Sequence, residues 1–126
     1  MMKTLFLQAP SFDGFDGGAG SRYQAKREIK SFWYPTWLAQ PAALVENSKL
    51  IDAPPHKTSL AEVVAQAKDF DLVVAHTSVP SFKSDVKVIE ALKAANPNLK
   101  AGLIGATVAV HAAGSLRTGA AIDFVA

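Results

Sequence analysis

Short apolar runs alternate along the chain with longer stretches in which apolar and polar residues mix at helical spacing. The runs at 71–75 and 101–105 lack the polar alternation of a half-exposed strand, which is typical of strands covered on both faces of a parallel sheet. We therefore predict five short strands, at 4–7, 49–51, 71–75, 101–105 and 122–125.

Helices are predicted between these strands. Ser59 and Glu62 have the spacing of a capping box, in which each side chain bonds to the backbone N–H of the other residue. Apolar residues then recur at helical spacing as far as Phe70. A second helix is expected to start after Ser84 and to stop before Pro97, because the residue before a proline disfavours helical geometry.

The alternation of strands and helices predicts a doubly wound α/β sheet, and right-handed crossovers limit its topology. An earlier helix near 36–46 is either delayed or kinked by Pro41, and a short helical turn is expected after Ser115. Without a dinucleotide fingerprint, five strands favour the flavodoxin-like order 2-1-3-4-5 in one three-layer α/β/α domain over residues 1–126. The last helix of that fold would be missing, so we expect an N-terminal piece of a longer protein.

Composition narrows the function classes. The chain has 126 residues, 49% of them apolar, with a net charge of +2, so no strong surface field dictates its partner. It has no cysteine, which excludes disulfides, an iron–sulfur cluster held by this chain and a thiolate zinc site. No segment has the length of a signal peptide's apolar region or of a membrane span, so a cytoplasmic location is expected.

The glycine-rich stretch LQAPSFDGFDGGAGSRYQ, residues 7–24, follows the first predicted strand. It fits neither phosphate-binding template: Tyr23 stands where GxGxxG needs its last glycine, and no Gly-Lys pair occurs. About 25 residues separate Ala9 from the first predicted helix, and loops of that length are usually functional or poorly ordered. We interpret the stretch as a long loop and not as a phosphate cradle.

Basic and aromatic residues follow in the same region. The cations Arg22, Lys26, Arg27 and Lys30 precede the aromatics Phe32, Trp33, Tyr34 and Trp37. Aromatics interleaved with cations can stack nucleobases. Four aromatics so close together are more often packing anchors, so we favour packing and expect no nucleic-acid partner.

A ligand site is predicted where the strands end, because ligands of open α/β sheets lie outside the carboxyl ends of the strands. Three segments converge there, although ordinary turn and capping chemistry would explain each of them alone. The predicted binding residues are Gln8, Ala9, Pro10, Thr77, Ser78, Val79, Gly105, Ala106, Thr107 and Val108.

No catalytic residue is predicted. His56 follows two prolines and is expected on the surface, whereas His76 and His111 are expected near strand ends, where they could meet a ligand. No carboxylate or cysteine stands at metal-ligand spacing from them, so no metal site is predicted. No nucleophile and base can be paired by their spacing.

Three sequence marks carry a family resemblance: QAPSFDGFDGGAG, FWYPTWLAQPA and LIDAPP. With them the chain resembles the N-terminal domain of the cobalamin-binding radical SAM enzymes associated with hopanoid biosynthesis, in their J-type branch. The resemblance runs through the whole chain and is strongest over residues 1–55. None of the three marks is a general catalytic motif.

The resemblance implies a cobalamin-binding domain of flavodoxin-like fold, inactive alone, whose partner is a C-terminal radical SAM domain. That missing domain would hold a [4Fe-4S] cluster and S-adenosylmethionine, and the full enzyme would form the cyclitol ether headgroup on the hopanoid side chain. Its lipid substrate could bring this cytoplasmic enzyme to a membrane. The alternative is a corrin-free interaction module that positions the barrel or its substrate.

Two departures from the family pattern concern the cofactor. The DxHxxG motif of other cobalamin proteins is absent, and GATVAV occupies residues 105–110 where a GGPHAT-like turn is common. Carried over by position, the segment that contacts the nucleotide tail corresponds to Thr77 and Ser78. The turn of close approach corresponds to Gly105 and Ala106.

The missing last helix leads to a prediction about assembly. One face of 122–125 and of 4–7 would be partly exposed, and about 300 Å² of apolar surface at about 25 cal/mol per Å² represents several kcal/mol. We expect the chain to self-associate through this face, or to fold residues 10–34 back over it with Phe32, Trp33 and Trp37. Self-association would appear in sedimentation as a dimer that Phe124→Asp dissociates. A compact monomer with Phe124 exposed and the loop disordered would contradict both versions.

Overall fold

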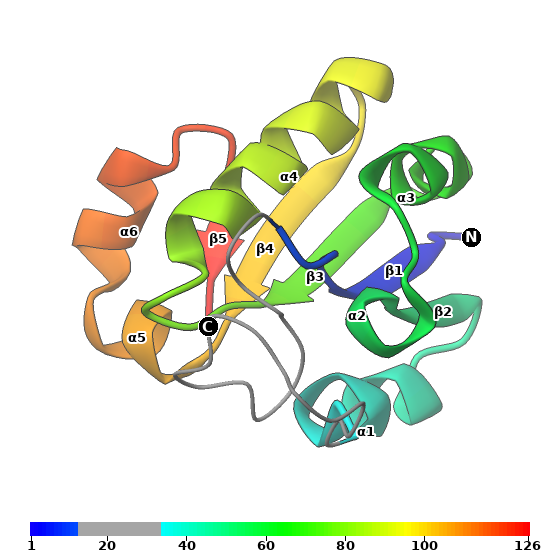
Figure 1. Ribbon diagram of the computed structural model, residues 1–126, viewed down its shortest axis with the longest axis horizontal. Helices are drawn as coiled ribbons and strands as arrows, with labels where there is room; N and C mark the ends of the chain where they lie inside the picture. Colours follow the sequence, from blue (N-terminus) through cyan, green and yellow to red (C-terminus); the bar gives the residue numbers. More distant parts are fainter. Residues whose placement is uncertain (13–33) are drawn as a thin grey trace.

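The sheet has five parallel strands in the order β2-β1-β3-β4-β5, as predicted (Figure 1). The structure is a computed structural model, and it describes residues 1–12 and 34–126. The strands are β1 (Thr4–Gln8), β2 (Ser48–Asp52), β3 (Leu72–His76), β4 (Lys100–Ile104) and β5 (Phe124–Val125). This order and the flanking helices make the fold flavodoxin-like.

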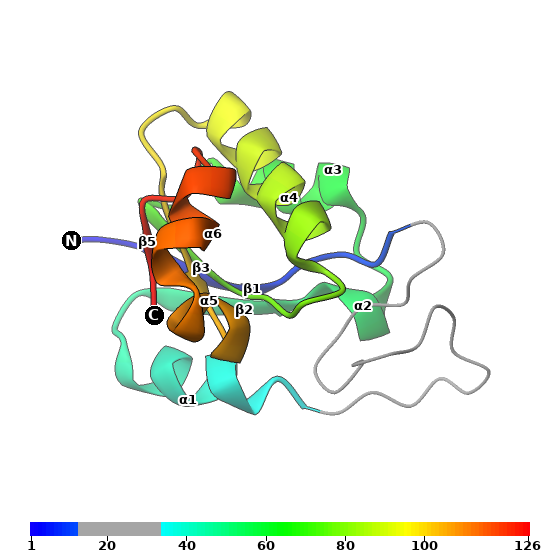
Figure 2. The ribbon, with the colours of Figure 1, turned by 90° about the vertical axis from the view of Figure 1, so that its left-hand side faces the viewer.

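Helices cover both faces of the sheet. They are α1 (Thr36–Leu44), α2 (Ala53–His56), α3 (Leu60–Ala67), α4 (Phe82–Ala95), α5 (Ala106–Val110) and α6 (Ala112–Thr118). Figure 2 shows α3 and α4 on one face and α1 on the opposite face. None of the helices in the described part of the chain is long and apolar enough to cross a membrane.

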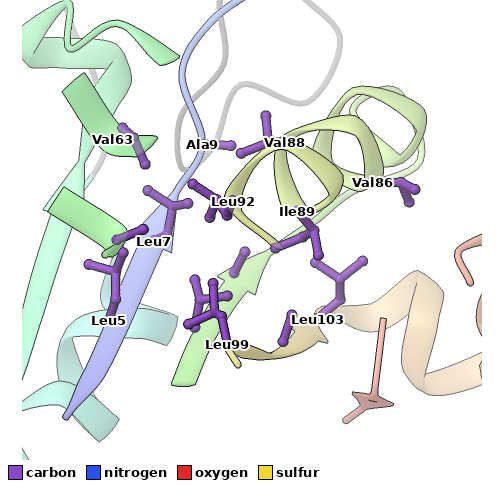
Figure 3. Packing of buried hydrophobic residues seen from close by; sticks show 14 of the residues in the cluster. Leu5, Leu7, Ala9, Val63, Val86, Val88, Ile89, Leu92, Leu99 and Leu103 are labelled. Carbon is purple, nitrogen blue, oxygen red and sulfur yellow. The ribbon is translucent and has the colours of Figure 1, made fainter. Parts of the chain in front are cut away.

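The larger core lies between the sheet and the pair α3 and α4. Successive strand residues point to opposite faces, so alternate residues such as Leu5, Leu7 and Leu103 meet Val63 of α3 and Ile89 of α4 (Figure 3). All five side chains are fully buried. Burial of this apolar surface holds the helices against the sheet.

Two sets of polar contacts fix the ends of a helix and of a strand. The capping box is present: the Ser59 N–H donates to Glu62 Oε2 at 2.7 Å, and the Glu62 N–H donates to Ser59 Oγ at 3.2 Å. The short strand β5 is held by Asp123, whose carboxylate accepts from the Ala101 N–H at 2.8 Å and pairs with Lys93 at 2.6 Å. The capping box confirms the predicted start of α3.

Several helix boundaries differ from the sequence prediction. The helix α4 begins at Phe82 and not after Ser84. Phe82 packs against the core and Asp85 is buried, so the first turn lies on the same inward face as the rest of the helix. A short helical turn was expected after Ser115. The structure instead has two helices after β4, α5 and α6, which His111 separates. The short helix α2 was not predicted. Pro54 lies in its first turn, where a missing N–H costs nothing.

The face that carries α1 is unevenly covered. Thr4 and Phe6 are buried beneath α1, so the predicted exposure of β1 is wrong. The predicted exposure of the last strand, β5, is confirmed for Phe124, which is 38% exposed. Its ring lies over Gly102, the residue opposite it on β4, at a distance that leaves no room for a Cβ. Whether the chain self-associates there stays a prediction.

Candidate ligand site at the carboxyl edge of the sheet

The strands β1 and β3 are neighbours whose following helices lie on opposite faces of the sheet. The chain after β1 leads to α1, whereas the chain after β3 leads to α4 (Figure 2). Such a reversal opens a crevice at the carboxyl ends of the two strands, and ligands of open α/β sheets bind there. The candidate site is therefore the edge at which Gln8 and His76 end their strands.

A row of polar residues lies along this edge on the α1 face. Gln8 of β1 is paired in register with Asp52 of β2, and His76 ends β3 on the other side of Gln8. The Oε1 atom of Gln8 and the Oδ1 atom of Asp52 are buried, and neither has a hydrogen-bond partner among residues 1–12 and 34–126. Burial lowers the pKa of His76, so its imidazole is neutral at pH 7.

A second polar group lies beneath the loop between β3 and α4. The Thr77 hydroxyl donates to Asp85 Oδ2 at 2.7 Å, and both residues are buried. Nearby, the Ser78 N–H donates to Ser81 Oγ at 3.1 Å, and the two serine hydroxyls are 2.8 Å apart. These bonds tie the loop to the first turn of α4 and give it a defined shape.

Asp85 is only 4% exposed, which is unusual because carboxyl side chains are seldom fully buried. Burial raises its pKa to about 7, and the hydrogen bonds from Thr77 and Ser81 only partly oppose that effect. These partners are hydroxyls, which stabilise a carboxylate less than a cation would. Asp85 therefore changes its protonation state near neutral pH.

The ends of β3 and β4 approach closely at Gly105. The Thr77 N–H donates to the Ile104 carbonyl at 2.9 Å, and a Cβ at position 105 would lie 2.4 Å from the Thr77 carbonyl oxygen. Gly105 also has a φ of 142°, a conformation that residues with side chains rarely adopt. The glycine thus lets the two loops meet, and the close approach is made by the Thr77 backbone.

The structure brings the three predicted segments to one edge but gives their residues different surroundings. Gln8, Thr77 and Ser78 form polar contacts or present buried polar atoms there, as described above. Ala9 and Val108 belong to the hydrophobic core, whereas Val79 and Ala106 are exposed and Pro10 and Thr107 are partly buried. The three segments therefore supply polar groups, core packing and exposed loop surface.

Sequence reasoning missed Asp52 and Asp85. Asp85 stands four residues before Ile89 and seven before Leu92, a spacing that places it on the inward face of α4. That signal could have revealed the buried carboxyl. The prediction that His111 lies near a strand end is wrong, because α5 separates it from β4, and its side chain is exposed. His56 is exposed, as expected.

The loop predictions fall mostly outside the described residues, since positions 13–24 of the glycine-rich stretch, the four cations, Phe32 and Trp33 lie within 13–33. The two described aromatics, Tyr34 and Trp37, are 88% and 68% exposed. Their interpretation as packing anchors is therefore wrong.

Comparison with known proteins gives no match: no family model, no curated protein and no solved structure matches this chain.

The contact at Gly105 predicts a large cost for any side chain there. Gly105→Ala places a methyl group against the Thr77 carbonyl in a strained conformation, and should lower the free energy of unfolding by about 2 kcal/mol. Urea denaturation measures the change. Gly114→Ala is the matched control, because Gly114 lies in α6 with open space around it and alanine there should stabilise by up to about 1 kcal/mol. Equal effects at the two positions would contradict the contact.

The buried Asp85 predicts a pH dependence of stability. Because its pKa is raised on folding, the folded state binds more protons than the unfolded state, and stability falls as pH rises from about 4 through 7. Asp85→Asn removes this titration. Between pH 4 and pH 8 the variant should therefore gain on the wild type by up to about 4 kcal/mol in urea denaturation. The exposed Asp69→Asn serves as control, and a parallel pH profile for wild type and Asp85→Asn would refute the assignment.

Proposed function

We propose that this chain is a cobalamin-binding domain that takes its cofactor at the carboxyl edge of the sheet, between β1 and β3. In the full protein it would serve a radical SAM enzyme that builds the cyclitol ether headgroup on the hopanoid side chain. The resemblance of the sequence to that family names the ligand, and the reversal of the chain between β1 and β3 supports its location.

The residues at this edge fit an uncharged, amide-rich ligand. Gln8 offers a buried amide oxygen to which no described residue donates a hydrogen bond, and burial lowers the pKa of His76, which ends the neighbouring strand. The loop that follows β3 presents Ser78, whose position corresponds to the tail-contacting segment of the family. Corrin carries several carboxamide arms, and hydrogen-bond acceptors and hydroxyls can bond to them.

Each element of this chain would have a defined task. Gly105 and Thr77 allow the loops after β3 and β4 to pack together. Ser78 and Gln8 would orient the ligand against these loops. Bound cobalamin supplies a cobalt centre that can take up and pass on electrons or a methyl group. The [4Fe-4S] cluster and S-adenosylmethionine would belong to the C-terminal radical SAM domain, and the whole enzyme would meet its lipid substrate from the cytoplasm.

An exposed apolar stripe supports a second candidate function. Along α1 and just before it, Trp37, Leu44 and Tyr34 are all largely exposed. Aromatic side chains such as Trp37 and Tyr34 are enriched in protein interfaces. A corrin-free module that positions the radical SAM domain through α1 would use this surface.

Titration with hydroxocobalamin separates the two functions. The proposal predicts a saturable change in the corrin spectrum at micromolar concentration, weakened about tenfold by His76→Ala at the edge. The matched control is His111→Ala, because His111 is exposed between α5 and α6 and its loss should leave the affinity unchanged. No spectral change at high micromolar hydroxocobalamin would favour the interaction module.

A further inference from the structure

Two buried oxygens at the edge proposed to bind the ligand have no hydrogen-bond partner in the described part of the chain, and they come from neighbouring strands. Gln8 Oε1 comes from β1 and Asp52 Oδ1 from β2, and the two residues are paired in the strand register. Gln8 is only 6% exposed. Since paired residues of neighbouring strands point to the same face, both side chains belong to the α1 face of the crevice.

Such a pair needs an explanation, because buried polar atoms in proteins nearly always have partners. A buried acceptor without a donor loses its water and gains nothing in return. Asp52 shows the effect: burial raises its pKa, and the Coulombic interaction with nearby His56 only partly opposes this. The described residues contain a third such atom, Thr4 Oγ1, which lies at the other end of β1.

The two oxygens share a chemistry and a place. Both accept hydrogen bonds, and both lie where ligands of open α/β sheets bind. The carboxylate of Asp52 also disfavours an anionic partner. A bound molecule that completes this pair must therefore present N–H donors that are neutral or cationic.

We propose that Gln8 and Asp52 form a subsite that accepts hydrogen bonds from carboxamide arms of the corrin ring. The inference rests on the proposed function, since it takes cobalamin as the ligand. It adds that the β1–β2 side of the crevice distinguishes a carboxamide from a carboxylate. Specificity would follow because a carboxylate arm lacks the N–H donors and meets the charge of Asp52.

The first test needs no ligand. If the Gln8 oxygen has no partner in the free protein, Gln8→Met removes a buried polar group at nearly constant volume and should raise the midpoint of thermal unfolding by about 4 °C. Gln40→Met, at an exposed position of α1, is the matched control and should change little. A lower midpoint for Gln8→Met would overturn the proposal, because it would show that the amide is already satisfied.

The second test measures the affinity for hydroxocobalamin through the corrin spectrum. The stabilised Gln8→Met variant should bind about tenfold more weakly than the wild type, and Gln40→Met should bind equally well. Wild-type binding that Gln8→Met leaves unchanged would overturn this inference and leave the proposed function standing. If the wild type does not bind, the proposed function fails, and this subsite for corrin fails with it.

The third test addresses the discrimination itself. Hydroxocobalamin derivatives in which one propionamide arm is hydrolysed to a carboxylate should include one that the wild type binds at least about tenfold more weakly than the parent. Asp52→Asn should recover most of that loss, because it removes the charge that repels the new carboxylate. If every derivative loses the same affinity on the wild type and on Asp52→Asn, Asp52 does not face a carboxamide arm and the proposal is wrong.

Discussion

The reversal of the chain between β1 and β3 is the constraint on which the site depends. Parallel strands require crossovers, and right-handed crossovers send the chain after β1 and the chain after β3 to opposite faces. In open α/β sheets, ligands bind at the carboxyl ends of two strands whose helices diverge in this way. Gln8 and His76 lie at this edge because they end those two strands, while Asp52 and Gly105 end or follow the strands on either side.

The two sides of this edge differ in how their polar groups are hydrogen-bonded. On the β3–β4 side, Thr77, Asp85 and the serine pair satisfy one another, and Gly105 allows the loops to pack at backbone distance. On the β1–β2 side, Gln8 and Asp52 bury oxygens that have no hydrogen-bond partner among the residues that the structure describes. Hydrogen-bonded loops beside buried acceptors without partners are the arrangement expected of a binding site. Polar groups that bond to one another stabilise the fold, whereas buried polar groups without partners are found where a ligand binds.

The sheet could be predicted from the sequence because its signal is local. Continuous apolar runs predict buried parallel strands, and Ser59 with Glu62 predicts the start of α3 through bonds that span only three residues. The surroundings of Asp52 and Asp85 could not be predicted so directly. Their burial depends on helices that pack from distant parts of the chain, and propensity describes a charged residue as exposed. Trp37 shows the converse, since an aromatic residue can lie on the outer face of its helix.

The proposed binding of hydroxocobalamin at the carboxyl edge between β1 and β3 can be tested residue by residue through amide chemical shifts. In ¹⁵N-labelled protein titrated with hydroxocobalamin, shift changes should gather at Gln8, Asp52, His76 and Gly105. The opposite edge of the sheet, represented by Asn47, Asp71 and Lys100, should remain unchanged. Changes centred on that opposite edge, or none at saturating hydroxocobalamin, would contradict the account.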